Sequence, residues 1–233
     1  MENNKNITVW FIVGFVVLAV GGVSIAYVMS GGTGSLASSA NPGFVATTVP
    51  AITSADWTEG NPKAKVSLIE YGDFECPACG EYEPIVEQIV NTYGNSIFFA
   101  FRNFPLYTIH PDAGISAQAA EAAGSQGKYW QMHDLLYKNQ ATWTSAASSS
   151  VVQQYFDGYA SSLGLNVDKF NQDINGSQVA AKIQADVSGG NGAQIDHTPT
   201  FFVNLTQIPN PMSYSEFKSV IDKALAAASG TTP

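Results

Sequence analysis

The stretch EYGDFECPACGEYEP, residues 70–84, contains both cysteines of the chain, Cys76 and Cys79. The residues before it, KVSLIEY at 65–71, form an apolar run that is typical of a buried strand. Apolar residues then recur at helical spacing until Gly94, which stands in the position of a helix C-cap. The sequence therefore predicts a strand followed by a helix that begins at about Cys76, with the cysteines at the junction.

A cysteine in the first turn of a helix is easier to ionise. If Cys76 is the N-cap, Pro77 takes the first helical position, where its missing N–H does no harm. The free N–H groups and the helix dipole then lower the pKa of the Cys76 thiol from about 8.5 toward roughly 3.5 to 7.5. Cys79, about 5–6 Å away, is within reach of a disulfide and is expected to be buried. Asp73 and Glu75 precede the pair, and we expect their charges to oppose its ionisation.

The remainder of the chain alternates between strand and helix patterns. Residues 96–104 are β-branched and aromatic and predict a second strand, parallel to the first through a right-handed crossover. Alanine-rich and amphipathic segments over residues 113–187 predict helices, residues 200–204 a further strand, and residues 214–228 a final helix. Pro84 is expected to kink the first helix one turn before it. This order predicts one α/β domain with a helical insertion.

Five segments taken together resemble the exported, often membrane-anchored DsbA-like thiol:disulfide oxidoreductases of the thioredoxin superfamily: VSLIEYGDFECPACG, FRNFPL, HPDA, AAEAAGSQGKYWQMHDLLY and HTPTFFVN. The resemblance covers about residues 56–228. It implies a thioredoxin fold over residues 51–233, with a helical subdomain inserted at about 106–190. It also implies that Cys76 is the nucleophile and Cys79 the resolving thiol of a redox-active pair.

The resemblance assigns residues outside the C-x-x-C motif as well. It implies that Thr198 precedes a cis-proline, Pro199, that faces the cysteines. Two positions depart from the family pattern. Ala78 stands where strong oxidants often carry histidine, and Leu205 stands where related hairpins usually have glycine, which puts the turn geometry in doubt.

Glu70 lies six residues before Cys76, on the strand whose apolar character predicts burial. In thioredoxin-like proteins this position commonly holds a buried acid. Burial raises the pKa of a carboxyl group, so Glu70 could accept the proton of Cys79, directly or through a water. The alternative is that Glu70 is a solvent-facing residue at a sheet edge.

The chain has three histidines. His197, two residues before the expected cis-proline, either tunes the cysteines or belongs to a surface loop. His133 lies on an amphipathic pattern and His110 in a turn, so both are expected to be structural. Aromatic residues near Phe74 and Trp143 are candidates to line a groove for unfolded polypeptide.

The N-terminal part of the chain differs in composition. Residues 7–29 contain no charge and are long enough, at about 1.5 Å per residue, to cross the roughly 30 Å of a bilayer core. We therefore expect one transmembrane helix, with residues 1–30 forming a cytoplasmic tail and anchor and residues 31–50 a Gly/Ser-rich tether. Lys5 favours an N-terminus inside and a catalytic domain outside the plasma membrane. A signal cleaved near Ala40, giving a secreted or periplasmic protein, is the alternative.

The predicted function is the introduction of disulfides into exported proteins. By the resemblance, the partners are reduced exported polypeptides and a quinone-linked membrane thiol oxidase; we expect a monomer without a cofactor. The net charge of −9 argues against nucleic acid as a partner. Isomerase or reductase activity on the same fold is the main alternative. A zinc site built from Cys76, Cys79 and His197, or a non-catalytic anchored module, is a further one.

Overall fold

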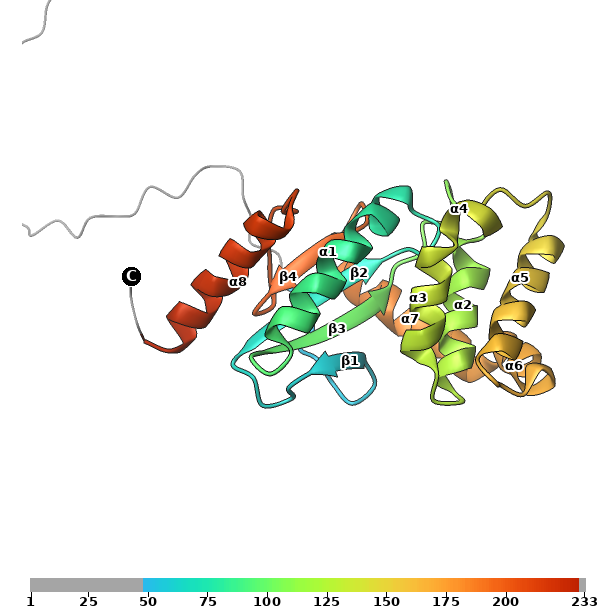
Figure 1. Ribbon diagram of the computed structural model, residues 1–233, viewed down its shortest axis with the longest axis horizontal. Helices are drawn as coiled ribbons and strands as arrows, with labels where there is room; N and C mark the ends of the chain where they lie inside the picture. Colours follow the sequence, from blue (N-terminus) through green and yellow to red (C-terminus); the bar gives the residue numbers. More distant parts are fainter. Residues whose placement is uncertain (1–47, 231–233) are drawn as a thin grey trace, which may run out of the picture. The chain divides into compact units, whose positions relative to one another are not determined.

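The computed structural model describes residues 48–230, which form a mixed sheet flanked by helices (Figure 1). The strands of this sheet lie in the order β1-β3-β2-β4-β5. Their bounds are β1 Trp57–Gly60, β2 Val66–Gly72, β3 Ile97–Asn103, β4 Thr200–Val203 and β5 Thr206–Gln207. Strands β2 and β3 are parallel, whereas the other neighbouring pairs are antiparallel. The predicted strand–helix–strand unit is confirmed, since helix α1 (Pro77–Tyr93) connects β2 to β3.

The central strand β2 is buried on both faces because its side chains alternate between two hydrophobic clusters. Leu68 packs in one cluster with Ile89 of α1 and Ile221 of α8 (Tyr214–Ala228). Tyr71 points the other way and packs in the second cluster with Phe104. This alternation follows from the two-residue period of a strand, and it places Glu70 on the α1 side of the sheet.

The expected helical insertion lies between β3 and β4 and gathers at one end of the sheet in Figure 1. Its helices are α2 Ala113–Gly124, α3 Tyr129–Lys138, α4 Gln140–Trp143, α5 Ser149–Ser162, α6 Val167–Ile174 and α7 Ser177–Gly192. The insertion shares one continuous core with the sheet, because Leu136 and Phe156 belong to the same cluster as Leu68. Helix α7 covers the Tyr71 face, where Gly190 comes close to Phe104.

The first strand, which the sequence did not predict, joins the sheet to the insertion. The indole of Trp57 stacks on Tyr129, with ring centroids 4.5 Å apart, and its Nε1 donates to Glu121 Oε2 at 2.8 Å. A Cβ at Gly124 would lie 2.3 Å from the Trp57 ring, so only glycine fits there. A large side chain on β1 therefore requires a small one on α2.

The hairpin between β4 and β5 forms in spite of the missing glycine. Asn204 and Leu205 both adopt positive φ angles, 49° and 67°, as a type I′ turn requires. Asn204 Oδ1 accepts a hydrogen bond from the Ser67 N–H at 3.0 Å, which helps to hold the turn. Leucine in the left-handed region is unfavourable by roughly 1–2 kcal/mol. The Leu205 carbonyl also accepts from the N–H of Val49, which is buried, so the folded domain begins no later than Val49.

The sequence also raised expectations about Pro84 in α1 and about the surroundings of Phe74 and Trp143. Helix α1 continues through Pro84 without interruption. Phe74 and Trp143 are both buried, so neither of these two residues lines a polypeptide-binding groove. Phe74 packs against Phe101, and Trp143 is held inside by a 2.8 Å hydrogen bond from its Nε1 to the Leu136 carbonyl.

Between residues 48 and 230, no helix has both the length and the hydropathy needed to cross a bilayer. The predicted transmembrane helix at residues 7–29 lies outside the described residues. The same holds for the cleavage position near Ala40 and for most of the predicted tether at residues 31–50.

Candidate active site

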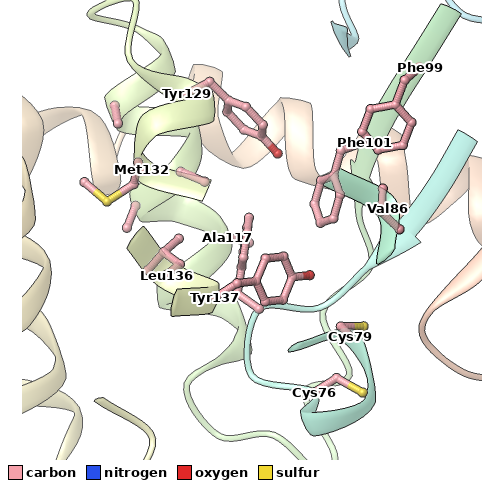
Figure 2. Packing of buried hydrophobic residues seen from close by; sticks show 14 of the residues in the cluster. Cys76, Cys79, Val86, Phe99, Phe101, Ala117, Tyr129, Met132, Leu136 and Tyr137 are labelled. Atoms are coloured by element: carbon pink, nitrogen blue, oxygen red, sulfur yellow. The ribbon is translucent and has the colours of Figure 1, made fainter. Parts of the chain in front are cut away.

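The two cysteines occupy the first turn of α1, as the sequence predicts. Cys76 is the N-cap residue, with extended backbone angles of φ −69° and ψ 119°, and Pro77 follows in the first helical turn. Figure 2 shows both sulfurs at this end of the helix. Cys76 is 6% exposed and Cys79 is fully buried, and the two thiols are not joined. The outer sulfur is thus the one that a second molecule can approach.

The environment makes the two thiols chemically different. A hydrogen bond from the Cys79 thiol is the largest influence that lowers the pKa of Cys76, to about 5, and the backbone N–H groups of Ala78 and Cys79 act in the same direction. Burial opposes this shift but does not cancel it. Burial raises the pKa of Cys79 well above that of an ordinary thiol, and its hydrogen bond to Cys76 raises it further. At neutral pH the pair therefore holds one thiolate and one thiol.

Both acidic residues before the pair accept hydrogen bonds from groups other than the cysteines. The Asp73 carboxylate accepts hydrogen bonds from the backbone N–H groups of Glu75 and Leu106, at 2.8 and 2.9 Å, and from His110 Nδ1 at 2.7 Å. Glu75 Oε2 accepts from the N–H of Asp112 at 2.6 Å. Neither carboxylate is among the main influences on the pKa of Cys76.

The loop before β4 faces the cysteines. The Thr198–Pro199 peptide bond is cis, as the family resemblance implies, and the Thr198 carbonyl lies 3.4 Å from Cys76 Sγ, where it accepts a hydrogen bond while the thiol is protonated. Asn210 Nδ2 donates to the Pro199 carbonyl at 2.6 Å, and Thr200 Oγ1 donates to the His197 carbonyl at 2.7 Å. These bonds hold the loop in place beside the reactive sulfur.

Glu70 is buried, with 1% of its surface exposed, so the alternative of a solvent-facing edge residue is wrong. Its Oε2 has no hydrogen-bond partner among residues 48–230. Burial raises the pKa of Glu70 well above its usual range, and the charges of Glu83 and Cys76 raise it further. The charge of Glu70 in turn raises the pKa of Cys79. The two groups therefore interact across the interior, while proton transfer between them stays a prediction.

The imidazole ring of His197 pairs with the residue before it in the sequence, Asp196. Its Nδ1 pairs with Asp196 Oδ1 at 2.7 Å, and its side chain is 55% exposed. Neither sulfur is among its hydrogen-bond partners in the described chain. Within residues 48–230, neither cysteine belongs to a cluster of three metal-ligating side chains. The geometry gives no support to His197 as a tuning residue or as a zinc ligand beside the cysteines.

Two residues at the site were missed in the sequence. Gln140 of α4 donates through Nε2 to the carbonyls of Phe74 and Cys76, both at 2.8 Å. Burial raises the pKa of Tyr137 of α3 well above its usual range, and the charges of Cys79 and Glu70 raise it further. Both residues lie about 60 positions away in the sequence, and no local pattern distinguishes them from other helix residues.

Comparison with known proteins identifies the family. The family model described as Thioredoxin matches residues 53–223, so the chain belongs to this family. The oxidised form of BdbD from Bacillus subtilis is similar in fold, with a TM-score of 0.66, 22% identity, and coverage of 77% of this chain and 97% of that one. The α-DsbA1 protein of Wolbachia pipientis also gives a TM-score of 0.66, with 24% identity and coverage of 77% and 95%. The predicted thioredoxin family is thus confirmed, and the fold is similar to that of these two proteins.

The curated relatives are longer proteins, and their names differ from those of the similar solved structures. The chain is 40% identical over 162 residues to Na(+)/H(+) antiporter NhaA 1 of Salinispora arenicola, a match that covers 70% of this chain and 24% of the relative. It is 34% identical over 189 residues to Na(+)/H(+) antiporter NhaA 3 of Salinispora tropica, covering 81% and 28%. The chain therefore spans about a quarter of the length of these relatives.

Proposed function

We propose that the protein is a thiol–disulfide oxidoreductase that uses the Cys76–Cys79 pair to introduce disulfides into other polypeptides. The observation that supports this proposal most directly is the difference between the two thiols. Cys76, at the helix start, has a pKa of about 5, whereas Cys79, one turn later, is buried and has a raised pKa. An outer sulfur that is a good leaving group and an inner sulfur that can attack it are what dithiol exchange requires. The fold shared with BdbD and α-DsbA1 supports the same activity.

The reaction begins from the disulfide form of the pair. A thiolate of the client attacks Cys76 Sγ, the bond between the two cysteines breaks, and Cys79 leaves with the electron pair and takes up a proton. A second client thiolate then attacks the client sulfur bound to Cys76, and Cys76 leaves as a thiolate. The client gains one disulfide and loses two electrons, which the Cys76–Cys79 dithiol now holds.

Glu70 has a place in this cycle. Because Cys79 is buried and its pKa is raised, its proton needs a nearby acceptor when the thiol attacks a mixed disulfide at Cys76. Glu70 is buried on the side of β2 that faces α1, and it interacts electrostatically with both sulfurs. We propose that it exchanges a proton with Cys79, directly or through water.

The low pKa of Cys76 favours the oxidising direction over reduction or isomerisation. A protein whose reduced form is stabilised as a thiolate is a stronger oxidant, as for DsbA at about −120 mV against thioredoxin at about −270 mV. The decisive measurement is the redox potential of the full chain in glutathione buffers, together with oxidation of a reduced, unfolded client. A potential above about −180 mV supports the oxidase, whereas one near −270 mV makes the protein a reductase. Cys76→Ser should abolish the exchange.

We further propose that residues 7–29 anchor the protein in the plasma membrane, with the domain outside the cytoplasm. The uncharged run of that segment supports this. Reduced exported polypeptides would then be the clients, and a quinone-linked membrane oxidase would restore the disulfide. Retention in carbonate-washed membranes, lost when residues 1–30 are deleted, would support the anchor. A mature N-terminus near residue 41 would show cleavage instead, and failure of an impermeant thiol reagent to label Cys76 in intact cells would contradict the orientation.

A further inference from the structure

A second cluster of polar side chains lies between α1 and α3, away from the cysteine pair. His133 Nδ1 lies 3.2 Å from Asp134 Oδ1 and 3.9 Å from Glu83 Oε1. The potential ligand atoms of these three residues all lie within 4.8 Å of one another. A tetrahedral zinc ion with bonds of about 2.0–2.1 Å holds its ligands roughly 3.3 Å apart. The cluster therefore needs only small movements to close around one ion.

The cavity beside this cluster is strongly acidic. It measures about 220 Å³, and its lining includes Glu59 and Glu87 in addition to the three clustered residues. No lysine or arginine lines this cavity; Lys138 lines a neighbouring one. Four carboxylates and one imidazole in a single cavity leave an excess of negative charge that a divalent cation would balance.

The orientation of His133 is a separate sign that a ligand belongs here. The residue is 3% exposed, and its Nε2 has no hydrogen-bond partner among the described residues. The ring is enclosed by aromatic side chains, with Phe101 at 4.9 Å and Phe74 at 5.4 Å between centroids, both nearly perpendicular to it. Aromatic faces are negative and accept an N–H more readily than a lone pair. We therefore assign the proton to Nε2, which leaves the Nδ1 lone pair directed at Asp134, its neighbour at 3.2 Å.

A lone pair that faces carboxylates is repelled unless a cation lies between them. Imidazole nitrogen with carboxylate oxygens is a ligand set that suits zinc. We propose that Glu83, His133 and Asp134 bind a zinc ion that links α1 to α3. A water, Glu59 or Glu87 completes the coordination. The ion would fasten the sheet part of the domain to its helical insertion, and the site does not depend on the redox function.

The test uses the full chain with Cys76→Ser and Cys79→Ser, so that zinc cannot bind the thiols. After removal of metal with a chelator, calorimetric titration with ZnCl₂ should show one site. Glu83→Gln and Asp134→Asn should each weaken binding by about tenfold or more. Glu81→Gln, an exposed acid on the same helix, is the matched control and should leave affinity unchanged. At equal zinc concentration, the rise in Tm should be smaller for Glu83→Gln than for the starting protein.

X-ray absorption at the zinc edge supplies a second readout that does not depend on folding. It should show one imidazole with oxygen ligands and no sulfur. Absence of zinc binding to the cysteine-free chain would overturn the proposal. The proposal would also be overturned if Glu83→Gln and Asp134→Asn bound zinc with the same affinity as the control Glu81→Gln.

Discussion

The side-chain amide of Gln140 donates a 2.8 Å hydrogen bond to the carbonyl of Cys76 and so ties the helical insertion to the reactive end of α1. The same nitrogen also holds the Phe74 carbonyl. Gln140→Ala leaves both carbonyls without this donor, and the expected loss of stability is about 1–3 kcal/mol. Urea unfolding measures it. Gln154→Ala, at an exposed site on α5, is the control and should stay within about 0.5 kcal/mol of the parent.

The ionisation of Cys76 gives a direct test of the site. Thiolate absorbance of the reduced protein should rise with a midpoint near pH 5 and should be absent in Cys76→Ser. Cys79→Ala removes the largest influence that lowers this pKa, so its midpoint should move upward. A midpoint near that of a free thiol, about 8.5, in the parent protein would contradict the assignment of Cys76 as the reactive sulfur.

The same pKa predicts how stability depends on pH. Because folding lowers the pKa of Cys76, its contribution is fully present above the pKa of the unfolded thiol, about 8.5, and is lost as the pH falls to about 5. The reduced protein should therefore gain stability relative to Cys76→Ser between pH 5 and 8.5. Unfolding in urea at several pH values compares the two proteins. A difference that does not change over this range would contradict the shift.

Glu121 should make the stability of the protein depend on pH in the opposite direction from Cys76. Burial raises its pKa to about 7, although its bonds with Trp57 and Asn103 act against the shift. Stability from this group is present at low pH and falls as the pH rises from about 4.5 to 7, by on the order of 3 kcal/mol. Glu121→Gln should flatten this part of the pH profile in thermal or urea unfolding. The exposed Glu81→Gln should leave the profile as it is.

Glu70→Gln tests proton transfer within the exchange cycle. If Glu70 accepts the Cys79 proton, its loss should slow the attack of Cys79 on a mixed disulfide at Cys76 by about 100-fold or more. Rapid acid quench and thiol labelling follow this step. The midpoint of the Cys76 titration in the same variant separates slower proton transfer from a changed Cys76. An unchanged rate would exclude the role.

A pair of helix glycines tests the packing of the insertion. Gly124→Ala would place a Cβ 2.3 Å from the Trp57 ring and should destabilise the protein by about 1–3 kcal/mol. Gly158→Ala, inside α5, meets no atom within 4 Å and should stabilise the protein by up to about 1 kcal/mol. Equal effects of the two substitutions on the free energy of unfolding would mean that Trp57 does not pack on α2 as described.

Local sequence patterns were sufficient to predict those parts of the fold that depend on interactions between residues close in the sequence. The β2–α1 junction could be predicted because the apolar run before Gly72, the N-cap Cys76 and Pro77 each favour the same arrangement over a few residues. The resemblance supplied what spacing could not, namely the cis bond before Pro199.

Other features depend on partners that are distant in the sequence. Strand β1 has four residues and no alternating pattern, and it is held by pairing with β3 and by the stacking of Trp57. The hydrogen bonds of Asp73 could not be predicted, because its partners His110 and the Leu106 N–H lie more than 30 positions later. Gln140 could not be predicted for the same reason.

The two-faced packing of β2 limits how the gene can change in length. Glu70 lies on the side of the reactive helix and Tyr71 on the other, where its hydroxyl accepts a 3.1 Å hydrogen bond from Arg102. Deletion or insertion of a single codon upstream within this strand would exchange the two sides and place the acid in the wrong layer. The helical insertion lies after β3, outside this alternation. Evolutionary gain and loss of residues should therefore be concentrated in the insertion and be excluded from the centre of the sheet.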